Sequence, residues 1–307
     1  MPILGTVASG YFEPPAATGL FATGGDTNTN TIDYVTISTL GNAVDFASLS
    51  VQRGAMGGCA SSTRGVFGAG VNDGGISNVI DYLTISAGGT ATDFGDVTAA
   101  RYLPSGLSNS TRGVFGGGWI GSNLNVVDYI TIATTGNATS FGSLSSARFY
   151  DAACASPTRG IFAGGNGPSG GATFVNNIDY ITIATTGNGT SFGTLGTNRE
   201  NLAGASNSVR GIFSGGNNPS PTDVIEYLTI ATTGNGTSFG NLPGGKPGVA
   251  SVSSSTRVLI AGTNNPAFNR KLIQYVEIAT TGNSVDFGEL TINRTRATPC
   301  SNSHGGL

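Results

Sequence analysis

The chain has 307 residues, a formal net charge of −3 and only 10% charged residues, while 50 of its residues are glycine. A weakly acidic chain with few basic clusters gives no electrostatic basis for binding nucleic acid, and no run of 18 apolar residues predicts a membrane-spanning helix. Three cysteines without a CxxC pair fit neither a disulfide scaffold nor a zinc site, so we expect reduced thiols and neither a metal nor another cofactor.

The first 17 residues stand apart from the rest of the chain. They read MPILGTVASGYFEPPAA and lack the basic start and apolar stretch of a secretion signal. A repeat begins at residue 18 and continues to the end. The sequence therefore predicts a leader over residues 1–17 and one repeat domain over residues 18–307.

Six repeat units follow, each of about 48 residues, and three side-chain types mark them. The first is a tyrosine: Tyr34, Tyr82, Tyr129, Tyr180, Tyr227 and Tyr275. A phenylalanine follows 12 residues later: Phe46, Phe94, Phe141, Phe192, Phe239 and Phe287. A basic residue follows after seven more: Arg53, Arg101, Arg148, Arg199, Lys246 and Arg294.

Each unit shows four β-strand patterns, named here A to D. In one unit they cover residues 148–155, 159–164, 177–184 and 189–195. Strand C alternates apolar and polar residues, and Gly-containing turns join A to B and C to D. Repeats of 40–50 residues with four strands each are typical of propeller blades. The fold class is therefore all-β, a six-bladed β-propeller with four antiparallel strands per blade.

The two ends of the repeat complete each other. Residues 297–304, ATPCSNSH, align with strand A, and residues 18–25, TGLFATGG, align with strand B. We expect the C-terminal strand to pair with the N-terminal blade and close the ring. Strand A is rich in small residues, as expected nearest the axis, and Cys59, Cys154 and Cys300 share one position in it as buried filler.

The repeat resembles the kelch family. That family has a basic residue at strand A, a Gly pair after strand B, a tyrosine in strand C and an aromatic residue in strand D. The pairs here are Gly24-Gly25, Gly117-Gly118, Gly164-Gly165 and Gly215-Gly216, altered to Ala69-Gly70 and Ala261-Gly262, and phenylalanine replaces the usual strand-D tryptophan. The resemblance implies the fold and says little about function.

The leader carries a second resemblance. Residues 3–12, ILGTVASGYF, resemble the opening of virion structural proteins of tailed bacteriophages. This implies a protein assembled in the host cytoplasm, located in the virion and attached to other virion proteins through residues 1–17. A cellular, cytoplasmic location is the alternative.

One face of the expected propeller carries the sequence variation. The B–C and D–A loops share this face, and the B–C loops differ in every unit. Variable loops on a rigid scaffold are typical of binding sites. Trp119, Phe174 and Phe268 lie in these loops and are candidates for stacking on a sugar ring or anchoring a protein. The alternative is that each covers its own loop or the groove between blades.

The basic residues form a second candidate site on the same face. Arg53, Arg101, Arg148, Arg199, Lys246 and Arg294 could attract an anionic glycan or a carboxylate. A competing partner precedes each tyrosine: Asp33, Asp81, Asp128, Asp179, Glu226 and Gln274. Bracing between blades is the simpler interpretation, and exposed ion pairs contribute only ~0–1 kcal/mol each.

No catalytic constellation is visible, so we expect no enzyme. His304 is the only histidine, it lies in the expected closing strand, and no local motif supports a nucleophile beside it. The first hypothesis is a structural or adhesion protein of a phage virion, such as a tail fibre, tail-associated or decoration protein, that binds a host-surface glycan, a receptor or another subunit. The second is a cellular kelch interaction module. The third is a glycan-degrading enzyme with distant carboxylates. Homo-oligomers are compatible with all three, although no heptads would drive a trimer.

Overall fold

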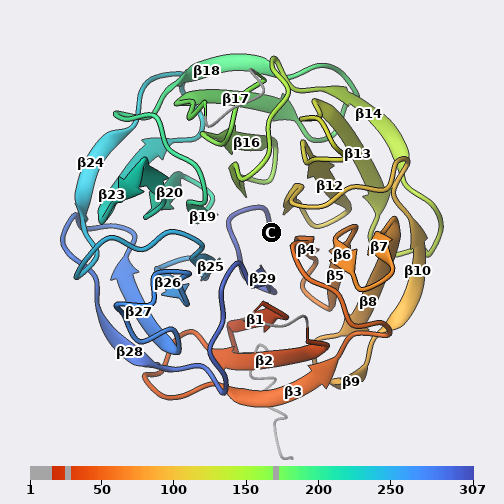
Figure 1. The fold of residues 1–307 in the computed structure, drawn as a ribbon, viewed down its shortest axis with the longest axis horizontal. Coiled ribbons are helices and arrows are strands. Elements are labelled where there is room, and N and C mark those ends of the chain that lie inside the picture. The colour runs from red at the N-terminus through yellow and green to blue at the C-terminus, as the bar shows by residue number, and fades with distance from the viewer. Residues whose placement is uncertain (1–15, 25–28, 169–172) are drawn as a thin grey trace, which may run out of the picture.

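The structure, a computed structural model, describes residues 16–24, 29–168 and 173–307. They form six four-stranded antiparallel sheets around a central axis (Figure 1). This confirms the six-bladed propeller. The described residues contain no helix, and hence none that could cross a membrane. Residues 1–15 of the expected leader, and Gly25 of the first glycine pair, lie outside the described residues.

Strand A of each blade lies next to the axis. From blade 2 to blade 6 these strands are β4 (Gly57–Ala60), β11 (Ser105–Ser108), β15 (Ala152–Ala155), β19 (Ala203–Ser206) and β25 (Ala250–Ser253), and in blade 1, which holds both chain ends, the strand is β29 (Thr298–Ser301). They crowd together, because a Cβ on Gly106 would lie 2.3 Å from the carbonyl oxygen of Gly58. The small residues of this strand are therefore a steric requirement. The strand is shorter than expected, since residues such as Tyr150 adopt a positive φ of 58° that interrupts the extended backbone.

Strand B packs directly behind it. The six are β1 (Thr18–Ala22), β5 (Arg64–Gly68), β12 (Arg112–Gly116), β16 (Arg159–Ala163), β20 (Arg210–Ser214) and β26 (Arg257–Ala261). The sulfur of Cys154 lies only 2.7 Å from where a Cβ on Gly211 would be, so a bulkier strand-B residue would displace it. All three cysteines are buried, and burial raises the pKa of Cys154 and Cys300 to about 12. They are packing residues, as the sequence predicts.

Strand C carries the repeated tyrosine. The six are β2 (Thr31–Thr36), β8 (Val79–Thr84), β13 (Val126–Thr131), β17 (Asn177–Thr182), β23 (Val224–Thr229) and β27 (Leu272–Glu277). In blade 2, Tyr82 meets Phe94 edge-on, with ring centroids 5.7 Å apart, and the guanidinium of Arg64 lies 4.7 Å from the Tyr82 ring centroid. Arg64 also donates to the carbonyl oxygens of Ile132 and Ala133 in blade 3. The tyrosine thus supports an arginine that joins neighbouring blades.

Strand D forms the rim. The six are β3 (Val44–Ser48), β10 (Thr92–Asp96), β14 (Thr139–Ser143), β18 (Thr190–Thr194), β24 (Thr237–Asn241) and β28 (Val285–Glu289). The C–D turn of the next blade covers its open edge, because Gly136 N donates to the Phe94 carbonyl and Asp96 N donates to Asn137 Oδ1. In the same way, the β9 segment (Gly89–Thr90) of blade 2 pairs parallel with β3 and covers the edge of blade 1. A sheet edge that would otherwise invite pairing is therefore occupied.

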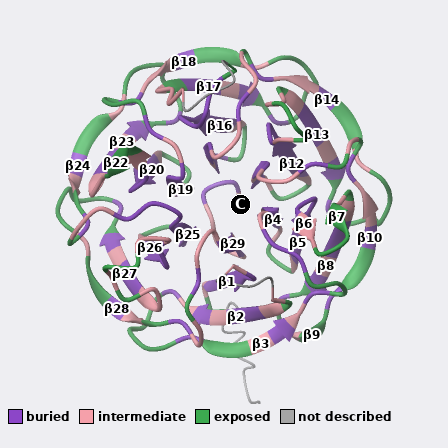
Figure 2. Cartoon of the chain, viewed as in Figure 1, coloured by how far each residue is buried: buried purple, intermediate pink, exposed green. Residues whose placement is uncertain are grey.

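The chain ends close the ring as predicted. Strand β29 pairs antiparallel with β1, with Cys300 opposite Leu20 and Pro299 opposite Phe21. Two short hairpins decorate the B–C loops of blades 2 and 5: β6 (Val71–Asn72) with β7 (Gly75–Ile76), and β21 (Asn217–Asn218) with β22 (Ser220–Pro221). The core lies between adjacent blades, and exposed residues concentrate on the rim and loops (Figure 2).

Candidate functional site

The basic residues predicted as a binding ring are buried. The ion pairs are Arg53–Asp81, Arg101–Asp128, Arg148–Asp179, Arg199–Glu226 and Arg294–Asp33, at 2.6 to 2.9 Å, and Lys246 donates to Gln274 at 2.8 Å. The five arginines have 0% exposed surface. Since these side chains have essentially no exposed surface, the geometry favours bracing over ligand binding. The expectation of weak, exposed pairs is corrected accordingly.

Each pair fastens a D–A connection to the blade that it enters. Arg53 lies on the connection into blade 2 and donates to Asp81 on β8 and to the carbonyl oxygens of Phe67 and Ala69. Ser50, on the same connection, donates to the other carboxylate oxygen of Asp81 at 2.6 Å. Burial lowers the pKa of Arg53, and the nearby Asp81 counteracts this. The pair therefore braces a connection against its own blade rather than one blade face against the next.

The three loop aromatics are half-buried and lie in different blades. Trp119 packs edge-on against Tyr102 at 5.2 Å, and the two residues also pair through their backbones. Phe268 lies against Gly244, with the Lys246 ammonium 5.6 Å from its ring centroid. Phe174 pairs by its backbone with Asn166. No ring contact joins any two of the three within the described part of the chain, so the structure does not assemble them into one platform.

A different set of residues surrounds the axis on the loop face. Each lies two positions after the basic residue and has a positive φ: Ala55, Leu103, Tyr150, Asn201, Gly248 and Arg296. We call these six residues the mouth ring. Backbone hydrogen bonds join neighbours around it, for example from Asn201 N to the Tyr150 carbonyl and from Arg296 N to the Gly248 carbonyl.

The mouth ring combines a constant backbone with six different side chains. Non-glycine residues in this conformation carry strain of roughly 1–3 kcal/mol each, and five of the six positions accept it. Sequence reasoning missed the ring because a left-handed conformation leaves no signature when the residue is not glycine. The available signal was the position itself, which varies in every unit although the basic residue two positions earlier is constant.

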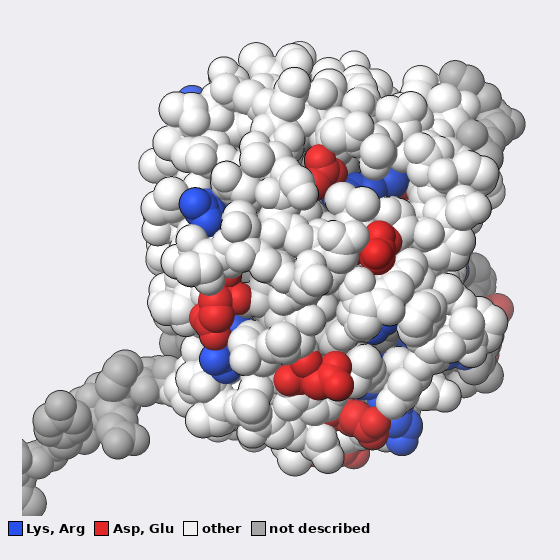
Figure 3. Space-filling view, turned by 90° about the vertical axis from the view of Figure 1, so that its left-hand side faces the viewer, with Lys and Arg blue, Asp and Glu red and all other residues white. Residues whose placement is uncertain are grey.

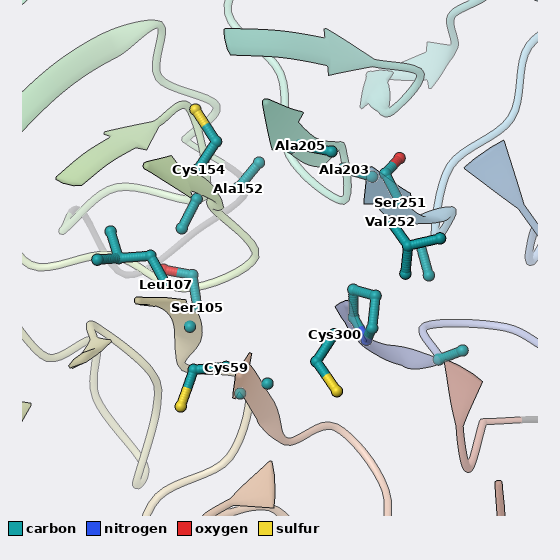
Figure 4. A pocket seen from close by; sticks show the side chains of 18 of the residues that line it. Cys59, Ser105, Leu107, Ala152, Cys154, Ala203, Ala205, Ser251, Val252 and Cys300 are labelled. Carbon is teal, nitrogen blue, oxygen red and sulfur yellow. The ribbon is translucent and has the colours of Figure 1, made fainter. Parts of the chain in front are cut away.

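Beneath the mouth ring, a cavity of about 170 Å³ follows the axis between the inner strands (Figure 4). Glycine, alanine, serine, valine and cysteine residues supply most of its wall. Two buried polar atoms of lining residues, Asp151 Oδ1 and Ser251 Oγ, have no hydrogen-bond partner within the described residues. Burial raises the pKa of Asp151 to about 6, although Arg148 and a hydrogen bond from Ser105 lower it.

The end of the chain closes the opposite end of this cavity, and the C-terminus lies at the centre of the disc (Figure 1). His304 Nε2 lies 3.0 Å from the Ala60 carbonyl oxygen, and Gly305 N donates to the Ser206 carbonyl at 2.8 Å. His304 lies in a turn after β29 rather than in the closing strand, which corrects the sequence expectation. Burial lowers its pKa. The histidine therefore helps to fix the C-terminal residues against the inner strands.

Two side chains from opposite blades meet across the mouth ring. The guanidinium carbon of Arg296, which enters blade 1, lies 4.9 Å from the ring centroid of Tyr150, which enters blade 4. Arg296 Nε also donates to Asn201 Oδ1 at 3.2 Å. Burial raises the pKa of Tyr150, and the Arg296 charge counteracts this. Arg296 is the only charged member of the ring and lies over the axis.

Among residues 16–24, 29–168 and 173–307, no group of three or more His, Cys, Asp and Glu side chains could hold a metal ion. Comparison of the chain with protein families and with curated proteins finds no match.

Proposed function

We propose that this chain is a non-enzymatic structural or adhesion protein of a bacteriophage virion, built on a kelch-type propeller. Its loop face would bind a host-surface molecule or another virion subunit. One observation carries the binding role: the repeated side chains are occupied in joining or bracing blades, whereas the side chains that differ between blades gather on one face.

The inter-blade contacts support this division. The strand-B arginines, the strand-C tyrosines and the asparagines of the C–D turns all make contacts within or between blades. Arg112, for example, stacks on Tyr129 of its own blade and donates to the Ile183 carbonyl in blade 4. The arginine is present in five blades, with Thr18 at its place in blade 1, and the asparagine is present in five, with Thr90 at its place in blade 2. The mouth ring and the B–C loops are free to differ, which is the arrangement expected of a recognition surface.

The virion assignment rests on residues 3–12 of the leader and on the low charge of the disc. Figure 3 shows the rim on the side of β24 with few charged side chains. The leader would attach the protein to a neighbouring virion protein and leave the loop face for its target.

The test is to purify particles of the source and search them for this protein, then to assay adhesion to host cells. We expect the protein in the particles, and we expect particles whose copy lacks residues 1–17 to lose it. Isolated propeller should compete with particles for host cells or for a virion subunit. Absence from particles together with binding to neither target would overturn the proposal.

A further inference from the structure

Most Lys and Arg side chains of this chain have a structural role in holding the blades or their connections in place. Of the 14 Lys and Arg residues, five arginines lie in buried ion pairs, Lys246 donates to Gln274, and five more arginines stack on strand-C tyrosines. Arg296 belongs to none of these sets, and it lies at the axis, above a cavity.

Arg296 has no acidic partner among the described residues. Its neighbours are the face of Tyr150 and the amide oxygen of Asn201, and both are neutral groups. No salt bridge to Arg296 occurs within the described residues. A guanidinium oriented by neutral groups keeps donors for an oxyanion, which it can bind with two parallel hydrogen bonds.

The cavity below Arg296 is narrow and lined mainly by small residues. These residues and backbone atoms form most of its wall, so it leaves room for one small ring. The unpartnered oxygens of Asp151 and Ser251 have no accessible surface in it, and Asp151 Oδ1 lies 3.4 Å from where a Cβ on Gly117 would be, between blades 3 and 4. Arg296 is therefore the side chain at the mouth that can recognise a charged group.

The volume of the cavity and the aromatic residues near its mouth narrow the class of ligand further. The cavity volume of about 170 Å³ is comparable with the ~150 Å³ engineered cavity that takes one benzene, so it holds one ring-sized group. Aromatic side chains flank the mouth on the side of blades 3 and 4, where Phe149 contacts Tyr150 at 4.7 Å and Tyr102 contacts Trp119. An aromatic ring presents an apolar face against which a sugar ring can pack.

From these observations we infer that the mouth ring and the cavity bind the acidic sugar of a glycan. Arg296 takes the sugar carboxylate, and Asn201 and Tyr150 flank it. This inference rests on the proposed function and names the ligand class of its loop face.

The test is calorimetric titration of the full chain with a panel of uronic and sialic acids, each beside its methyl ester. We expect at least one acid to bind and its ester to bind about tenfold more weakly or worse, because esterification removes the charge that Arg296 recognises. Arg296→Gln should weaken binding of the acid by a similar factor and so remove most of the difference between acid and ester. Thr186→Glu, an exposed change on the opposite face, alters the net charge by the same amount and should have no effect.

Two outcomes overturn the inference: no acid of the panel binds, or acid and ester bind equally well and Arg296→Gln changes neither. The particle assay separates this failure from that of the proposed function. If particles adhere to host cells and neither acidic sugars nor Arg296→Gln reduce adhesion, the proposed function stands and the sugar site does not. Adhesion through a protein receptor is one such outcome.

Discussion

Arg294 and Arg296 lie two residues apart and show the two uses of side chains in this molecule. Arg294 is fully buried and hydrogen-bonded to both carboxylate oxygens of Asp33, and the equivalent arginines of blades 2 to 5 each pair with one carboxylate oxygen. Arg296 lies at the axis, half-buried, and has no counterpart of its type in the repeat. A repeated residue with a repeated partner holds the ring together, whereas a singular residue at a repeated backbone position is a candidate for recognition.

The largest effect should come from Arg294→Gln. This change leaves Asp33 buried without its cation and removes a link between the chain ends, so we expect a loss of about 3–5 kcal/mol in the free energy of unfolding. Urea unfolding followed by circular dichroism measures it. A loss below about 1 kcal/mol would mean that the buried pair behaves like a surface pair.

Asp151→Asn should instead raise the free energy of unfolding, by an amount that depends on pH. The Asp151 pKa is raised from 3.8 to about 6, so the folded state holds a proton that the unfolded state has released between these values. Stability from this group is present below about pH 4 and is lost as the pH rises through 6. We expect the variant to be more stable than the wild type at pH 8, by up to about 3 kcal/mol, and to lose this advantage at pH 4. A difference that does not change with pH would contradict a titrating buried carboxyl.

Asn137→Ala probes the contact between the C–D turn of blade 3 and the rim strand of blade 2, and it should have a moderate effect on stability. It removes the acceptor for Asp96 N on the edge of β10, which we expect to cost about 0.5–1.5 kcal/mol. Thr135→Ala, in the same turn and with an exposed side chain, is the matched control and should be close to neutral. Equal effects of the two changes would show that the asparagine does not clamp the neighbouring blade.

The smallest effect on stability should come from Arg296→Gln. Its contact with Tyr150 is only partly buried, so we expect a loss of no more than about 1 kcal/mol in the same urea assay. A loss equal to that of Arg294→Gln would place Arg296 among the structural residues and remove the contrast between the two arginines.

The sequence was sufficient to predict the architecture because the same pattern of residues occurs in every blade. The six tyrosines and phenylalanines fix the blade number, and Cys300 aligned with Cys59 and Cys154 reveals the closing strand. Burial of the basic residues could not be derived, because the folding of each connection back over its blade depends on contacts distant in sequence.

The candidate site was less accessible from the sequence than the fold. The tail at Gly305, the left-handed mouth ring and the meeting of Tyr150 with Arg296 across the axis follow only from ring closure in three dimensions. Trp119, Phe174 and Phe268 were chosen for their residue type, and each packs within its own loop region.

Pairing of β29 with β1 also affects how the molecule should unfold. A linear array of repeats has end units that touch one neighbour and fray first. In this ring every blade has two neighbours, so releasing any one of them breaks two interfaces at once. Unfolding should therefore be a single concerted event, with no terminal blade that loosens before the others.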